Sequence, residues 1–64
     1  MYETKYLNVK EACVFLGVGR GTLLRLCRER PHQFPAVQIG RRYQMDAELL
    51  AKWKADWYAG AFHI

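Results

Sequence analysis

Residues 8–28 read NVKEACVFLGVGRGTLLRLCR, a segment whose pattern predicts two short helices joined by a tight turn. Asn8, followed three residues later by Glu11, is the pattern of a capping box, in which each residue binds the other's main-chain amide at the start of a helix. Helical spacing then gives an apolar stripe of Val9, Ala12, Cys13 and Leu16. Gly17 permits the left-handed conformation that ends a helix. A short first helix is therefore expected between Asn8 and Gly17.

A second helix is expected to begin at Arg20 and to end at Pro31, which cannot continue it. Its apolar face carries Leu23, Leu26 and Cys27, whereas Arg20, Leu24, Arg25 and Arg28 lie largely on the other face. Two short helices joined across LGVG (residues 16–19) have the sequence form of a helix-turn-helix. One glycine between helices is weak evidence, but the small residues of the first helix and the apolar residues of the second together favour this motif.

Glycines stand at the start of the second helix, at positions 19 and 21, where Ser or Thr would cap the helix better. Gly21 in the first turn costs roughly 1 kcal/mol or less relative to Ala. One interpretation is that the missing side chains let main-chain amides and the positive end of the helix dipole approach a DNA phosphate. The other is a merely permissive turn. For glycines alone, the second interpretation is favoured.

A β-hairpin is expected from AVQIGRRYQM, residues 36–45, because the segment alternates between apolar and polar residues. The alternation places Val37, Ile39, Tyr43 and Met45 toward the core. Gly40 suits the first central position of a two-residue turn, which puts Arg41 at the tip and Arg42 beside it. A hairpin with a cationic tip beyond a helix-turn-helix has the geometry of a wing, and its arginine can enter a narrow minor groove. A charged, solvated turn is the alternative.

Asp46 is a good N-cap for a last helix, which is expected to run to about Ala59, before Gly60. Its apolar stripe is expected to hold Leu49 or Leu50 together with Trp53 and Trp57. The apolar tail AFHI, residues 61–64, can dock on the domain, meet a partner or fray. Residues 1–64 are therefore predicted to form a single α+β domain with a core over about residues 5–59. Two N-terminal helices, a β-hairpin wing and a C-terminal helix would make up the domain.

Positive charge is concentrated in the middle of the chain. All six arginines lie between residues 20 and 42, where Glu29 is the one acid, so this segment carries a charge of +5. The flanks hold four lysines and five acids, a charge of −1, and the two parts sum to the net charge of +4. Guanidinium presents a planar donor fork that matches phosphate oxygens and the guanine edge. The segment therefore suggests contact with nucleic acid, although a solvated charged face is the alternative.

Composition narrows the function further. A pI near 9.4 favours polyanionic partners. No apolar run approaches the ~20 residues that span a bilayer. The first residues lack a signal pattern, so a cytoplasmic protein with reduced thiols is expected. Cysteines and histidines stand at positions 13, 27, 32 and 63 without a CxxC pair, so no metal or cofactor is expected. Neither histidine has an evident nucleophile or paired carboxylate nearby in sequence, and the chain is not expected to be an enzyme.

Three segments of the chain resemble the excisionase-like helix-turn-helix family: YLNVKEA (6–12), LGVGRGTL (16–23) and FPAVQIGRRY (34–43). The resemblance covers about residues 5–57 and implies a compact, MerR-like winged helix. It also implies that the second helix enters the major groove and that the Gly40–Arg41 hairpin is the wing. The family usually has Ser at the position of Gly19 and often an aromatic residue at that of Leu24. A capping hydroxyl and one familiar backbone contact are therefore absent from this chain.

The leading hypothesis is a small protein that binds double-stranded DNA sequence-specifically, bends it, and biases a phage-type integrase toward excision. The chain lacks a long dimerisation helix, so a monomer that assembles cooperatively on DNA is expected. Candidate DNA-binding residues are Arg20, Gly21, Thr22, Leu24, Arg25, Arg28, Gly40, Arg41 and Arg42. One alternative is a transcriptional regulator of a phage, plasmid or transposon. Another is a protein-interaction module whose surface is formed by Trp53, Trp57, Tyr58 and Phe62.

Overall fold

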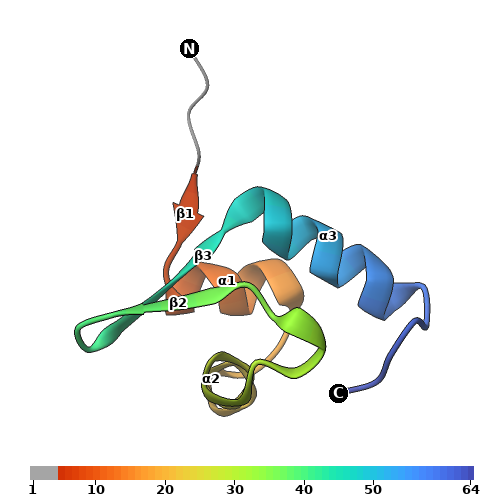
Figure 1. The fold of residues 1–64 in the computed structure, drawn as a ribbon, viewed down its shortest axis with the longest axis horizontal. Coiled ribbons are helices and arrows are strands. Elements are labelled where there is room, and N and C mark those ends of the chain that lie inside the picture. The colour runs from red at the N-terminus through yellow and green to blue at the C-terminus, as the bar shows by residue number, and fades with distance from the viewer. Residues whose placement is uncertain (1–4) are drawn as a thin grey trace.

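The structure is a computed structural model that describes residues 5–64. Helices and strands follow in the order β1 (Tyr6–Leu7), α1 (Val9–Leu16), α2 (Arg20–Glu29), the 3₁₀ turn η1 (Pro31–Gln33), β2 (Ala36–Ile39), β3 (Arg42–Asp46) and α3 (Ala47–Tyr58). The β2–β3 hairpin projects from the body of the molecule, with α2 below it and α3 on the side opposite the hairpin tip (Figure 1). The predicted α+β class and the order of its two helices, hairpin and last helix are confirmed.

The helix-turn-helix forms as the sequence predicts. The Asn8 side chain accepts a hydrogen bond from the Glu11 amide at 2.8 Å, and Glu11 accepts one from the Asn8 amide at 3.1 Å, which completes the capping box. Gly17 ends α1 with φ +73°. The α1 residues Ala12 and Leu16 are buried against Leu23, Leu26 and Cys27 of α2. Burial of these two apolar stripes fixes the angle at which α2 leaves the turn.

Strand β3 lies in the middle of a three-stranded antiparallel sheet of order β1-β3-β2. The strand Tyr6–Leu7 was not predicted, because two residues are too few to show a period-two pattern. The main-chain hydrogen bonding between β1 and β3 continues one residue beyond the strand pairs, where the Ala47 amide donates to the Lys5 carbonyl at 2.9 Å. The short strand thereby leads the chain into α1 and fixes the start of that helix against β3.

The core face predicted for the hairpin is wrong in one strand. Val37 and Ile39 are each 55% exposed, whereas Ala36 is buried opposite Met45. The two-residue loop makes Ile39 the cross-strand partner of Arg42, and partners in an antiparallel pair share a face. Hence a hairpin that turns Met45 inward must turn Ile39 outward beside Arg42. The register set by the turn overrides the apolar pattern of β2.

Helix α3 covers the helix-turn-helix and satisfies the free carbonyls at the end of α1. Leu50 and Trp53 are buried, Trp57 is half-buried and Leu49 is 54% exposed, so Leu50 is the leucine of the predicted stripe. The Lys54 ammonium donates to the Phe15 carbonyl at 2.8 Å, and the Tyr58 hydroxyl donates to the Leu16 carbonyl at 3.2 Å. These bonds tie α3 to the helix that positions α2.

The tail docks on the domain through Phe62, which is one of the three alternatives left open by the sequence. Its ring stacks on His32 with centroids 4.3 Å apart and lies 4.9 Å from the ring of Trp53. The Trp53 indole in turn donates to the Pro31 carbonyl at 3.4 Å. This aromatic cluster packs against η1. His32 and Gln33 in this turn, and Arg30 just before it, have positive φ values that L-residues adopt at a cost.

Candidate nucleic-acid interface

Helix α2 presents its basic residues away from the core. Because Leu23, Leu26 and Cys27 are buried, the 100° rotation per residue directs Gly21, Arg25 and Arg28 to the opposite, exposed face. Arg20 and Leu24, one turn apart, lie on the flank toward β3, whereas Thr22 lies on the other flank. The helix therefore carries candidate residues on three sides: the exposed face, the flank toward the hairpin and, with Thr22, the opposite flank.

The hairpin turn places two further arginines at the projecting end of the sheet. Gly40 has φ +62°, and Arg41 is not among the residues with positive φ, as in a type II′ turn. The prediction of a two-residue turn is confirmed. Arg41 forms the exposed tip, and Arg42 follows it on β3, also exposed. The type II′ turn lets the strands keep their twist while it carries a cation at the end of the hairpin.

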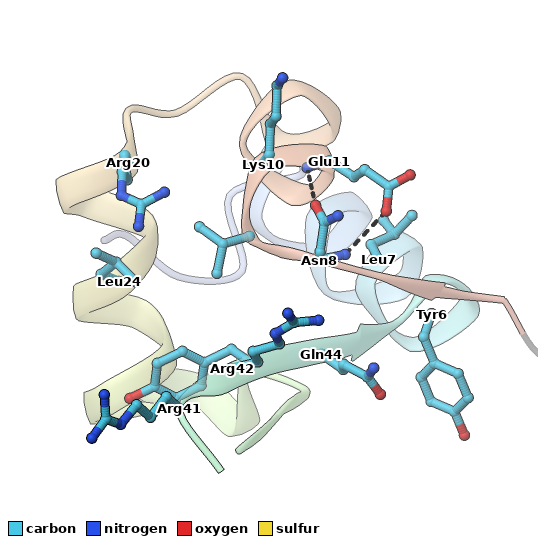
Figure 2. Close-up of a pocket in the computed structure, with 12 residues that line it drawn as sticks. Tyr6, Leu7, Asn8, Lys10, Glu11, Arg20, Leu24, Arg41, Arg42 and Gln44 are labelled. Carbon is cyan, nitrogen blue, oxygen red and sulfur yellow. Dashed lines mark hydrogen bonds between the residues drawn. The ribbon is translucent and has the colours of Figure 1, made fainter. Parts of the chain in front are cut away.

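A groove of about 500 Å³ separates α2 from the hairpin. Helix α2 lines one wall with Arg20 and Leu24, and the hairpin lines the other with Arg41 and Arg42. In Figure 2, Arg20 and Arg42 point toward the middle of the groove from opposite sides. The structure thus brings together four of the predicted residues, whereas Arg25, Arg28, Thr22, Gly21 and Gly40 do not line this groove.

Within residues 5–64, no carboxylate forms a salt bridge with the arginines of the groove. Glu11 lines the groove too, but its carboxylate binds the Asn8 amide in the capping box. On the exposed face of α2, by contrast, Arg25 Nε lies 3.9 Å from Glu29 Oε1, and both side chains are about three-fifths exposed. An exposed pair at this distance contributes little stability. Arg25 thus has an acidic neighbour on the outer face of α2, whereas Arg20, Arg41 and Arg42 form no salt bridge within residues 5–64.

Some residues that line the groove were not singled out from the sequence: Lys10, Tyr43 and Gln44. Lys10 is the second residue of α1, where the positive end of the helix dipole disfavours a cation. This unfavourable position was the available signal. No comparable signal marks Tyr43, which was assigned to the core and is half-buried, or Gln44, which was assigned to solvent and is half-buried as well.

The cysteines have structural positions. Cys27 is buried in the core and Cys13 packs against it. Burial, followed in importance by the neighbouring Cys13, raises the pKa of the Cys27 thiol. Among residues 5–64 there is no group of three or more His, Cys, Asp or Glu side chains that could hold a metal ion. The thiols therefore belong to the packing between α1 and α2.

The aromatic residues of α3 do not form an open interaction surface. Trp53 is 5% exposed, and Trp57 and Phe62 are half-buried in the cluster around it. Tyr58 is 65% exposed but donates its hydroxyl hydrogen to the end of α1. The protein-interaction alternative therefore keeps Tyr58 as an exposed aromatic side chain, while Trp53, Trp57 and Phe62 pack in or against the core.

A helix-turn-helix followed by a β-hairpin that projects beside the second helix defines the class of winged helix-turn-helix domains. Domains with this motif bind DNA and are not enzymes as a rule. Residues 6–57 match the model of the family described as "Helix-turn-helix domain", and the chain belongs to that family. Comparison with curated proteins and with solved structures found no match. In the part of the chain that the structure describes, no helix is long and apolar enough to cross a membrane.

Proposed function

We propose that this chain is a sequence-specific binder of double-stranded DNA that bends the duplex as an excisionase-type directionality factor for a site-specific integrase. The observation that carries the proposal is the convergence of Arg20, Arg41 and Arg42 on one groove without a paired carboxylate in the described part of the chain. Helix α2 would enter the major groove, and the Gly40–Arg41 tip would reach the adjacent minor groove. Such an arrangement contacts both grooves from one side of the duplex.

The candidate residues divide by the contacts they would make. Arg25 and Arg28, on the exposed face of α2, are suited to base edges or phosphates of the major groove. Gly21 and Thr22 lie in the first turn, where main-chain amides can approach a phosphate. Arg41 at the tip of the wing is suited to a narrow minor groove, whose negative potential attracts arginine. Bending by tens of degrees costs about 1–6 kcal/mol, which these contacts have to offset.

The test begins with footprinting on the DNA that flanks the gene, because repeated sites beside a recombination site are expected for a directionality factor. The footprinted site is then placed at different positions in fragments of equal length. Strong bending in gel mobility, together with altered integrase products, supports the proposal. Repression of a promoter on nearly straight DNA would instead assign the same surface to a transcriptional regulator of a mobile element.

Salt dependence tests DNA binding independently of the biological role. Each phosphate neutralised contributes about −0.9 to the log-log slope of the binding constant against salt concentration. Contacts from α2 and the wing together predict a slope steeper than about −3. An affinity that hardly responds to salt would refute the basic groove as the binding surface.

A further inference from the structure

The basic groove has a third wall, which belongs to neither α2 nor the wing. The first turn of α1 closes the end of the groove between β3 and α2, and Asn8, Val9 and Lys10 line it there. Figure 2 shows Lys10 at the rim, with its ammonium group turned outward. Lys10 is exposed, and no carboxylate forms a salt bridge with it within residues 5–64. A polyanion that runs through the groove and out past this end would therefore meet a cation at the rim.

The position of Lys10 is unfavourable for the isolated chain. It follows Val9 at the start of α1, where the unpaired amides concentrate the positive partial charge of the helix. Across the groove, Arg20 lines the wall formed by α2 and Arg42 lines the wall formed by the hairpin. Four cations line the hollow, Lys10, Arg20, Arg41 and Arg42, against one carboxylate, that of Glu11. The excess positive charge would be neutralised by an anion bound in the groove.

The walls also offer apolar surface between the cations. Leu24 of α2 and Tyr43 of β3 are half-buried, and Val9 of α1 is half-buried at the closed end. Cations at the rim with apolar side chains between them match the chemistry of a sugar-phosphate backbone, in which charged phosphates alternate with deoxyribose. A free phosphate ion would use the cations but not the apolar surface.

From this arrangement we infer that the groove seats the backbone of one strand of the duplex, and that Lys10 makes a phosphate contact from α1. The inference rests on the proposed DNA-binding function. It extends the interface to α1, which is neither the recognition helix nor the wing. Lys10 sits near the capping box, so the start of α1 is held rigidly where the backbone would pass. The contact contributes affinity and register on the duplex and carries no base preference.

The test compares Lys10→Ala with Lys52→Ala, which removes the same charge from an exposed position on α3 outside the groove. Binding of a fluorescently labelled duplex of mixed sequence is measured by anisotropy over a series of salt concentrations. Lys10→Ala should reduce the magnitude of the log-log slope by about 0.9, as expected for one lost phosphate contact, and Lys10→Arg should restore it. Lys52→Ala should leave the slope close to that of the unchanged chain.

If Lys10 stabilised the fold, Lys10→Ala would lower the melting temperature. The helix dipole at the start of α1 disfavours a cation, so Lys10 is not expected to stabilise this helix. Thermal unfolding of Lys10→Ala should therefore show no loss of stability. If Lys10→Ala and Lys52→Ala change the slope equally, the inference fails while DNA binding by α2 and the wing stands. If the unchanged chain itself shows no salt-dependent binding to the duplex, the proposed function fails and the inference with it.

Discussion

Gly21→Ala separates the requirements of the fold from those of DNA binding. Gly21 is exposed in the first turn of α2, and a Cβ atom there would meet no atom of the chain within 4 Å. Its φ is not positive, so alanine fits without backbone strain. Alanine in place of a helical glycine should stabilise the domain by about 0.5–1 kcal/mol. For a domain of this size, the melting temperature should rise by about 2–8 °C.

The same methyl group should weaken binding if the start of α2 lies against a phosphate. Displacing the phosphate would remove a charge-assisted hydrogen bond from a main-chain amide, worth about 1.5–3 kcal/mol. The expected loss in affinity for duplex DNA is about tenfold to a hundredfold. The measurements are a thermal melt by circular dichroism and an anisotropy titration at a temperature where all variants are folded.

Gly17→Ala is the matched control, because Gly17 ends α1 with φ +73°. Alanine at a left-handed position should destabilise the domain by about 1–2 kcal/mol. The two glycine variants should therefore change stability in opposite directions, while the loss of DNA affinity is expected of Gly21→Ala. A Gly21→Ala protein that melts higher and binds DNA as tightly as the unchanged chain would refute the approach of the α2 amides to the phosphate.

Three further predictions concern the wing, the outer face of α2 and the core. Arg41→Ala should weaken binding and bending in gel-shift titrations while circular dichroism shows an unchanged fold, and unaltered affinity would exclude the wing from the interface. Arg25→Ala should cost about 1–3 kcal/mol more on the footprinted site than on random DNA if Arg25 pairs with guanine; Glu29→Gln, which frees Arg25 and removes a negative charge, should tighten binding to both. Burial raises the pKa of the Cys27 thiol, so the thiol stabilises the fold below its unfolded-state pKa of about 9.0, and this stabilisation is lost as the pH rises from there through the higher folded-state pKa. In urea unfolding, the free energy of unfolding of Cys27→Ala should fall less over that pH range than that of the unchanged chain. An equal fall would contradict the assignment.

The fold could be predicted to a large extent from the sequence because its signals are local. Capping residues, the glycine of the turn and apolar stripes of helical period each act over a few residues, and they fixed α1, α2 and α3. The outward face of Val37 and Ile39 needed the pairing register as well. The two-residue turn around Gly40 already implied that register. The apolar alternation of β2 and the register set by the turn predict opposite faces for Val37 and Ile39. The structure follows the register, because Ala36 and Met45 fill the core on the other face.

The site was predictable only in part, since a groove depends on elements that are distant in sequence. The charge pattern identified Arg20, Arg41 and Arg42 but gave no means of telling that they face one hollow while Arg25 and Arg28 do not. That division follows from which flank of α2 faces the hairpin, which depends on packing between elements distant in sequence. The α1 wall was missed for the same reason.

Within residues 5–64, the side chains of the groove arginines take no part in the hydrogen bonds or salt bridges of the fold. Largely buried apolar residues form the core, among them Leu16, Leu23, Met45 and Leu50. The side-chain hydrogen bonds between elements come from Trp53, Lys54 and Tyr58, and none of those found within residues 5–64 uses an arginine. Cations that repel one another and satisfy no internal partner lower the stability of a domain that buries little surface. A polyanion bound across the groove would offset that cost, which gives a physical reason for placing Arg20, Arg41 and Arg42 around it.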